Sequence, residues 1–130
     1  SVHPVAREAI YRSIHRLVSK VIIKNKRDEI LMAKVKRGHF TGFWTLPGGY
    51  MDHDEHPSIG CVRETMEELG IDIQLNDIKP VITQKLFNDV GISFVSFCFW
   101  LLFYNVDDWW QMSVYSVDSH QSLDSSTLFL

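Results

Sequence analysis

Several features are scarce in this 130-residue sequence, and each scarcity excludes a class of protein. There are only two cysteines, Cys61 and Cys98, and they form neither a CxxC pair nor a metal-finger spacing. A disulfide scaffold is therefore excluded, and both thiols are expected to be free in a reducing cytoplasm. Positive charge is scarce too. The net charge of -3 provides no broad basic field for a nucleic-acid backbone, so no nucleic-acid partner is expected.

A run of apolar residues long enough to cross a membrane is also missing. The stretch ISFVSFCFWLLFY, residues 92–104, is shorter than the ~20 residues that a membrane helix needs. It is rich in aromatic and β-branched residues, so it is expected to be a buried strand. The first eighteen residues mix charged and apolar side chains without a continuous signal-peptide core. We therefore expect one cytoplasmic domain over residues 1–130, with no membrane partner.

The remaining pattern predicts a mixed α/β sheet with a helix on one face. Residues 1–14 are predicted to form an N-terminal arm or a short helix, and residues 16–36 a hairpin around the turn KNKRDE. Further strands are expected at 71–75, 79–87 and 92–106, the last two paired across the turn NDVG. Residues 107–130, rich in serine and aspartate, are predicted to be an irregular or truncated tail.

A helix is predicted between Pro57, which suits a first helical turn, and Gly70, which suits a helix end. An apolar stripe recurs along it at helical spacing: Ile59, Val62, Met66 and Leu69. At ~100° per residue, Glu64, Glu67 and Glu68 lie on the side away from that stripe. We therefore expect the helix to bury the stripe and to present the three carboxylates on its other face.

The stretch RETMEELG, residues 63–70, places these glutamates where like charges repel. A divalent cation would relieve the repulsion, and Mg²⁺ prefers oxygen ligands from a few carboxylates, waters and substrate phosphates. Bound metal would also polarise a phosphoryl group and lower the pKa of an attacking water. For an acidic pair alone, a plain solvated helix face is the alternative.

The spacing around these glutamates is more specific than the charges. From Gly49 the sequence runs G-x5-E-x7-R-E-T-x-E-E-x-G-I, over 23 contiguous residues. This resembles the signature of the Nudix hydrolases, which cleave nucleoside diphosphates linked to another moiety, and the preceding WTLPGG resembles the usual entry to that motif. The pattern departs at Thr65, where the family usually has a bulky aliphatic residue. That position is structural in the family, so the departure affects packing rather than chemistry.

The resemblance implies an α/β/α sandwich around a mixed β-sheet and a Mg²⁺-dependent pyrophosphohydrolase, with Mn²⁺ as a possible substitute. The implied substrate is a nucleoside diphosphate derivative such as a nucleotide sugar, an ADP-ribose-like molecule or a nucleoside triphosphate. The implied catalytic residues are Glu64, Glu67, Glu68, Arg63 and Glu55. The three helix glutamates and the backbone carbonyl of Gly48 are the implied metal ligands, while Arg63 and Glu55 pair to hold a loop against the helix.

Other candidates lie outside the motif, each with a plainer alternative. Phe43 and Trp44 are candidates for stacking on a nucleobase, although aromatic residues beside a glycine loop also serve packing. The candidate phosphate contacts, which otherwise are ordinary surface, are Lys34, Lys36 and Arg37. The candidates for a general base are Asp89, Asp107 and Asp108, and Glu67 or Glu68 orienting the water directly is the alternative. The histidines His39, His53 and His56 have no metal-ligand spacing of their own.

Two other functions remain open. One is a Nudix-like sensor that binds a nucleotide without cleaving it, and the other is an isomerase acting on an isoprenoid diphosphate. The stretch KLFND, residues 85–89, has neither of the subtype markers expected there, so the particular nucleotide is not specified. Because the tail does not look like a covering helix, we expect Trp109 and Trp110 to cover part of a sheet face and a second copy to cover the rest, making a homodimer.

Overall fold

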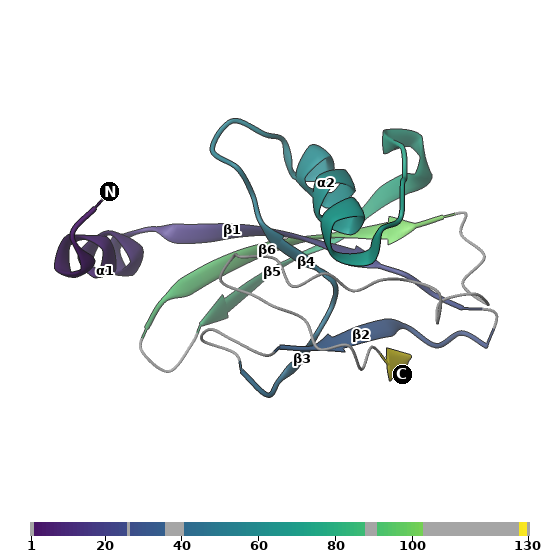
Figure 1. Ribbon diagram of the computed structural model, residues 1–130, viewed down its shortest axis with the longest axis horizontal. Coiled ribbons are helices and arrows are strands. Elements are labelled where there is room, and N and C mark those ends of the chain that lie inside the picture. The colour runs from purple at the N-terminus through teal and green to yellow at the C-terminus, as the bar shows by residue number, and fades with distance from the viewer. Residues whose placement is uncertain (1, 26, 36–40, 88–90, 103–127, 130) are drawn as a thin grey trace.

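The computed structural model describes residues 2–25, 27–35, 41–87, 91–102 and 128–129 (Figure 1). The following candidates lie outside the described residues: Lys36, Arg37, His39, Asp89, Asp107, Asp108, Trp109 and Trp110. The chain folds around a four-stranded sheet made of β1 (His15–Ile22), β4 (Gly48–Tyr50), β5 (Ile78–Phe87) and β6 (Ser93–Leu101), in the order β4-β1-β6-β5. β1 runs parallel to β6 and antiparallel to β4, while β5 and β6 are antiparallel. The predicted mixed sheet and the predicted pairing of its last two strands are confirmed.

The helix α2 (Pro57–Leu69) packs on one face of this sheet (Figure 1). A shared core joins them, consisting of Val21, Ile23, Leu31, Cys61, Leu69, Ile71, Ile73, Ile78, Phe99 and Leu101. A second sheet has the order β3-β2-β7, from β3 (Trp44–Thr45), β2 (Leu31–Lys34) and β7 (Leu128–Phe129). In Figure 1 it lies on the side of the molecule away from α2. The helix boundaries expected from Pro57 and Gly70 are confirmed, and Gly70 has the left-handed φ of 70° that suits glycine.

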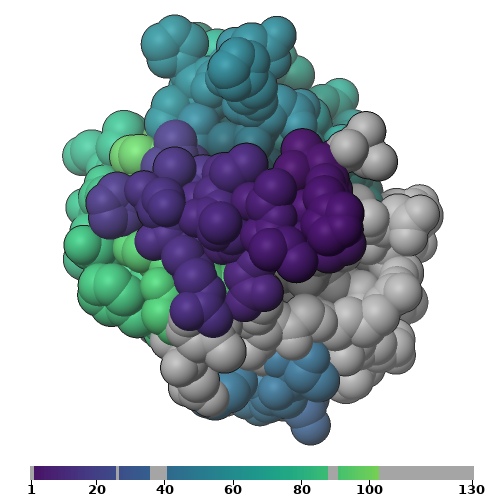
Figure 2. Space-filling model, turned by 90° about the vertical axis from the view of Figure 1, so that its left-hand side faces the viewer, coloured from purple at the N-terminus to yellow at the C-terminus, as the bar shows by residue number. Residues whose placement is uncertain are grey.

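The N-terminal segment is a helix rather than an arm. α1 (Pro4–Ser13) begins after His3, whose Nδ1 accepts a hydrogen bond from the Val5 N–H at 3.2 Å. None of its residues is buried, because it projects from one end of the sheet (Figure 1). Figure 2 looks onto that end, where α1 forms the purple surface beside the green strands. Within the described residues, neither helix is long and apolar enough to cross a lipid bilayer.

The predicted hairpin over residues 16–36 is present only near its turn. Lys24 and Ile30 form an isolated bridge, and the Leu31 N–H donates to the Ile23 carbonyl at 2.9 Å. Beyond that point β2 leaves β1 and joins the second sheet. The reason is that both edges of β1 are already paired, one with β4 and the other with β6.

One further expectation from the sequence is wrong. Residues 71–75 form no strand. Ile71 and Ile73 are buried and Asp72 is exposed, but the chain then turns into the short 3-10 helix η1 (Leu75–Asp77). Asp77 Oδ2 accepts from the Gln74 N–H at 2.8 Å, and this cap replaces strand pairing. In the tail, Leu128 and Phe129 form β7, which pairs with β2. Residues 107–127 lie outside the described residues, so the predicted irregular or truncated tail stays a prediction.

Candidate active site

The helix α2 turns its carboxylates toward the sheet. Glu64 and Glu68 are 4% and 1% exposed, whereas Ile59 and Met66 from the apolar stripe are both 42% exposed. The expectation that the stripe is buried and the carboxylates face outward is therefore wrong for Ile59 and Met66 and for Glu64 and Glu68. It is confirmed for Leu69, which is buried in the core, and for Glu67, whose side chain is 41% exposed. The buried face also carries Gly60, Cys61 and Thr65, three small residues that let α2 lie close to the strands. Small side chains, rather than the apolar period, decide which face packs.

Two glycines of β4 make room for this arrangement. Gly48 has a φ of 148°, and a Cβ there would lie 2.0 Å from the Ser19 carbonyl oxygen of β1. A Cβ on Gly49 would lie 2.6 Å from Glu64 Oε2. The Gly48 N–H also donates to Glu68 Oε2 at 3.0 Å. The glycine pair therefore allows both carboxylates to approach the backbone of β4 closely.

Each of the two buried carboxylates keeps one oxygen without a hydrogen bond. Within the described residues, Glu64 Oε2 and Glu68 Oε1 are buried and have no hydrogen-bond partner. Buried unsatisfied carboxylate oxygens destabilise a protein unless a cation or donor satisfies them. Burial raises the pKa of Glu64, and it raises the pKa of Glu68 to about 8, against the opposing effects of Lys20 and the Gly48 N–H. Both carboxylates are therefore set up to gain from a cation.

A divalent cation fits these two oxygens. The described residues contain no group of three acidic, histidine or cysteine side chains gathered as a metal site. Glu67 instead bonds Arg63 and its side chain is 41% exposed. Mg²⁺ commonly binds through one or two carboxylates and takes its other ligands from water and substrate phosphates. Glu64 and Glu68 provide that number, and Gly48 lies against them.

Arg63 ties the surrounding parts together. Its Nη2 and Nε bond the two oxygens of Glu55 at 2.6 and 3.1 Å, so the predicted pair is present. Its Nη1 donates to Glu64 Oε1 at 2.9 Å and to Glu67 Oε2 at 3.1 Å, and Nη2 donates to the Tyr50 carbonyl at 3.0 Å. The hydrogen bond from Arg63 holds the pKa of Glu55 below its ordinary value. One guanidinium thus connects α2, β4 and the loop that carries Glu55.

A cavity of about 470 Å³ lies between residues of the two sheets. It is lined by Lys20, Ile22, Ile30, Met32, Trp44, Thr45, Leu46, Gln84, Leu86 and Ser96. Of the candidates from the sequence, Trp44 lines this cavity, while Phe43 is 66% exposed and is not among the lining residues. Lys34 is exposed on β2 and is not among them either. The described residues bring Trp44 to the cavity and leave the other two outside.

Sequence reasoning missed four polar residues that line this cavity: Lys20, Thr45, Gln84 and Ser96. For Lys20 a signal was available. It interrupts the apolar run LVSKVII and is only 6% exposed, although lysine is rarely buried. Gln84 and Ser96 carry no comparable signal, because they are polar residues in strands whose packing the sequence does not specify.

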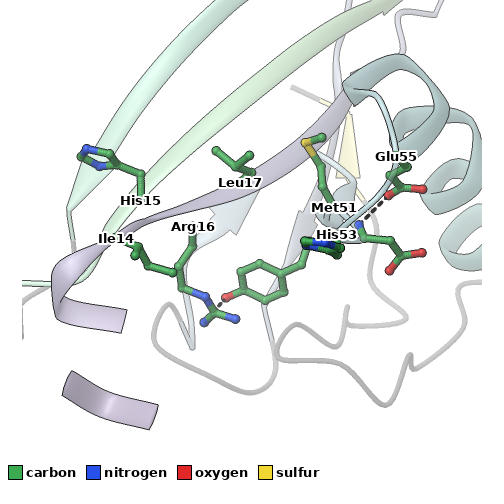
Figure 3. Close-up of a pocket in the computed structure, with 9 residues that line it drawn as sticks. Ile14, His15, Arg16, Leu17, Met51, His53 and Glu55 are labelled. Carbon is green, nitrogen blue, oxygen red and sulfur yellow. Dashed lines mark hydrogen bonds between the residues drawn. The ribbon is translucent and has the colours of Figure 1, made fainter. Parts of the chain in front are cut away.

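A second pocket, of about 290 Å³, lies where β1 begins (Figure 3). It is lined by Ile14, His15, Arg16, Leu17, Tyr50, Met51, Asp52, His53 and Glu55. The Arg16 guanidinium lies between the rings of Tyr11 and Tyr50, at 4.1 and 4.0 Å from their centroids. Glu55 borders this pocket, and its Oε1 accepts from the Asp52 N–H at 2.8 Å (Figure 3). The pocket thus lies on the outer side of the loop that Arg63 holds.

Comparison with known proteins identifies the family. Residues 14–113 match the model of the NUDIX domain. The 8-oxo-dGTP diphosphatase of Proteus vulgaris is 36% identical over 53 residues, which are 40% of this chain and 47% of that protein. Nudix hydrolase 2 of Arabidopsis thaliana is 33% identical over 66 residues, 49% of this chain and 24% of that protein. The matched region thus spans about half or less of these curated relatives.

Solved structures agree in fold. The MutT NUDIX hydrolase from Burkholderia pseudomallei superposes with a TM-score of 0.71 at 22% identity, over 89% of this chain and 82% of that one. The NUDIX domain of Shewanella oneidensis NrtR, complexed with ADP ribose, superposes with a TM-score of 0.63 at 16% identity. The superposition covers 98% of this chain and 82% of that one. The expected α/β/α sandwich is therefore confirmed as the fold. Because residues 14–113, which are most of this chain, match the family model, the chain belongs to the Nudix family.

Proposed function

We propose that this protein is a divalent-metal-dependent pyrophosphohydrolase that cleaves the diphosphate of a nucleoside diphosphate derivative. The observation that carries the proposal is the pair of buried carboxylates, Glu64 and Glu68, each with an oxygen that has no hydrogen-bond partner among the described residues. A solvated helix face would not bury these groups, because burial without a partner costs free energy. The arrangement is accounted for if a cation binds there during function.

The proposed metal ligands are Glu64, Glu68 and the Gly48 carbonyl, with Glu67 joining when it leaves Arg63. Mg²⁺ is the proposed metal, and Mn²⁺ is a substitute with the same preference for oxygen ligands. When bound, it would polarise the phosphoryl group and lower the pKa of the attacking water. Glu67, whose side chain is 41% exposed beside the buried pair, is the residue proposed to orient that water.

Arg63 and Glu55 are proposed to position the site. Their paired hydrogen bonds fix the loop before α2, and the same guanidinium holds one oxygen of Glu64. This leaves Glu64 Oε2 as the oxygen that faces a cation. A planar guanidinium can hold several carboxylates at once in this way, which a lysine ammonium cannot do with the same geometry.

The cavity between the sheets is the proposed site for the nucleoside part of the substrate. Its volume of about 470 Å³ is in the range of small-molecule sites, and Trp44 offers an aromatic face to a base. Phe43 and Lys34 are proposed to contact the substrate from outside the cavity, as is Arg37, which lies outside the described residues. The names of similar proteins include an 8-oxo-dGTP diphosphatase and a domain complexed with ADP ribose, which supports a nucleotide derivative as substrate.

A panel of nucleoside triphosphates, nucleotide sugars and ADP-ribose, assayed chromatographically for nucleoside monophosphate formed with and without Mg²⁺, tests the proposal. We expect turnover only with the metal. Glu64→Gln and Glu68→Gln should each lower it by roughly two orders of magnitude, the scale of removing one group that stabilises transition-state charge. Glu8→Gln on the exposed surface of α1 is the matched control and should retain activity. Hydrolysis that survives both site variants would contradict the assignment.

Binding without turnover is the signature of the alternative, a nucleotide sensor. Calorimetric titration with the same panel separates the two functions, since a sensor would bind a nucleotide tightly and form no nucleoside monophosphate from it. The two site variants should keep their fold, because each removes a buried negative charge and its repulsion. We further propose one domain, a cytoplasmic setting and a homodimer for this chain. The cytoplasmic setting is supported by the two free thiols, Cys61 and Cys98, both buried.

A further inference from the structure

Lys20 is a buried cation in the middle of β1. It is 6% exposed, although transfer of an ammonium group out of water is costly unless a negative partner lies nearby. In the strand register it pairs with Gly48, and a Cβ on Gly48 would lie 2.8 Å from Lys20 Cδ. The lysine stem therefore runs along the glycine that also contacts Glu68.

Negative groups lie on one side of this lysine. Burial lowers the pKa of Lys20, and the charges of Glu68 and then Glu64 act in the opposite direction. The ammonium is thus within electrostatic reach of the two carboxylates that each keep an unbonded oxygen. Without the lysine, this pair of buried negative charges would repel with little compensation from within the described residues, apart from Arg63 on Glu64.

Lys20 also borders the proposed nucleoside cavity. Lys20 lines it together with Trp44, Gln84 and Ser96, and among the described lining residues it is the one that carries a charge. Its position therefore joins the carboxylate pair to the cavity. A diphosphate that joined a nucleoside in the cavity to a cation on Glu64 and Glu68 would lie beside this lysine in the proposed arrangement.

We propose that Lys20 has two successive partners: it neutralises Glu64 and Glu68 before a metal binds, and it then binds an oxygen of the substrate diphosphate. This inference rests on the proposed function and adds a residue from β1 to it. A divalent cation on the carboxylates repels the ammonium, and a phosphate oxygen beside the cation attracts it. Lys20 therefore opposes metal binding in the absence of substrate and favours diphosphate binding once the metal is present.

The inference predicts effects of opposite sign in one variant. Lys20→Met keeps an unbranched side chain, shorter by one heavy atom, and removes the charge. Calorimetric titration of the substrate-free protein with Mn²⁺ should show about tenfold tighter binding in the variant, the scale of one charge-assisted interaction. Titration of the Mn²⁺-loaded protein with methylenediphosphonate, a diphosphate that cannot be hydrolysed, should show binding weaker by about tenfold or more. Lys79→Met, which alters an exposed lysine of β5, should change neither affinity.

Each outcome decides between the proposals. If Lys20→Met weakens the binding of both Mn²⁺ and methylenediphosphonate, or changes neither affinity, the proposed role of Lys20 is wrong. If the Glu68→Gln variant binds Mn²⁺ as tightly as the wild-type protein does, the proposed metal site itself is wrong. If Lys20→Met does not fold, Lys20→Gln and the wild-type protein complete the test. In the ¹⁵N-lysine NMR spectrum of the wild type, the Lys20 signal should shift on addition of Mg²⁺ and again on addition of methylenediphosphonate. A Lys20 signal that ignores both additions would equally overturn the inference.

Discussion

At the scale of single residues, the site depends on side chains that are costly to bury and are satisfied by specific partners. Arg63 contributes hydrogen bonds to Glu55, Glu64, Glu67 and the Tyr50 carbonyl. These four partners come from α2, β4 and the loop between them, so one side chain fixes three segments. The motif spacing predicts the Arg63–Glu55 pair, because both residues belong to the family pattern. The bond to Tyr50 was not predictable, since it depends on the path of the loop.

Cys61 shows how burial alone changes the chemistry of a residue. It lies between α2 and β1, 1% exposed, and burial raises the pKa of its thiol to about 12. Thr65, at the position where the family usually carries an aliphatic residue, bonds the Cys61 carbonyl at 2.7 Å and is itself buried. The departure at Thr65 therefore concerns helix packing, as the sequence predicted. A neutral, enclosed thiol is unsuited to act as a nucleophile or a metal ligand.

We predict that Cys61 makes the protein less stable at alkaline pH. The unfolded thiol loses its proton near pH 9, whereas the folded thiol keeps it up to about 12. Between these values the native state binds more protons than the unfolded state, so the free energy of unfolding falls as pH rises, by at most about 1.4 kcal/mol per pH unit. Urea unfolding at a series of pH values should show that the free energy of unfolding falls less steeply with pH in Cys61→Ala than in the wild-type protein. Equal slopes in both proteins would contradict this prediction.

At the scale of elements, the sequence located α2 and misjudged its orientation. Pro57 and Gly70 mark the ends correctly because helix boundaries depend on local backbone chemistry. The buried face depends on what lies opposite, and the glycines of β4 allow Glu64 and Glu68 to point inward. The same limit explains β2. Its apolar pattern predicts a strand, but its partner is decided by the competition for the edges of β1.

The close approach of β4 to β1 gives a direct test of this geometry. Gly48→Ala should destabilise the protein by about 3 kcal/mol or more, because it adds overpacking against the Ser19 carbonyl to a strained φ. Gly42→Ala is the matched control. Gly42 also has a positive φ, of 88°, but a Cβ there would have no heavy atom within 4 Å, so about 1 kcal/mol of backbone strain is expected. If urea denaturation shows the same loss in free energy of unfolding for Gly48→Ala and Gly42→Ala, the contact with β1 is unimportant for stability.

At the scale of the whole molecule, the candidate site is assembled from segments that are far apart in the sequence. The parallel pairing of β1 with β6 brings Lys20 next to Cys98, and β5 adds Gln84 and Leu86 to the cavity wall. No local pattern reports such long-range pairing. The proposed metal ligands could be named from the sequence because the glutamates lie in one 23-residue motif and Gly48 directly precedes it. The cavity could not be predicted, because its walls come from five different strands and the chain beside them.

The edge strand β5 is where we expect a second copy of the chain to bind. Within the described residues β5 pairs only with β6, and its apolar side chains Val81, Ile82 and Phe87 are 52%, 50% and 63% exposed. A long, apolar sheet edge tends to pair with another strand, and charged residues prevent this. Sedimentation at micromolar concentration should therefore show a homodimer, and Val81→Lys should convert it to a monomer without unfolding it. Val5→Lys, at a 73% exposed position on α1, is the matched control and should remain a dimer. A monomeric wild type, or a Val81→Lys variant that dimerises like the wild type, would contradict this interface.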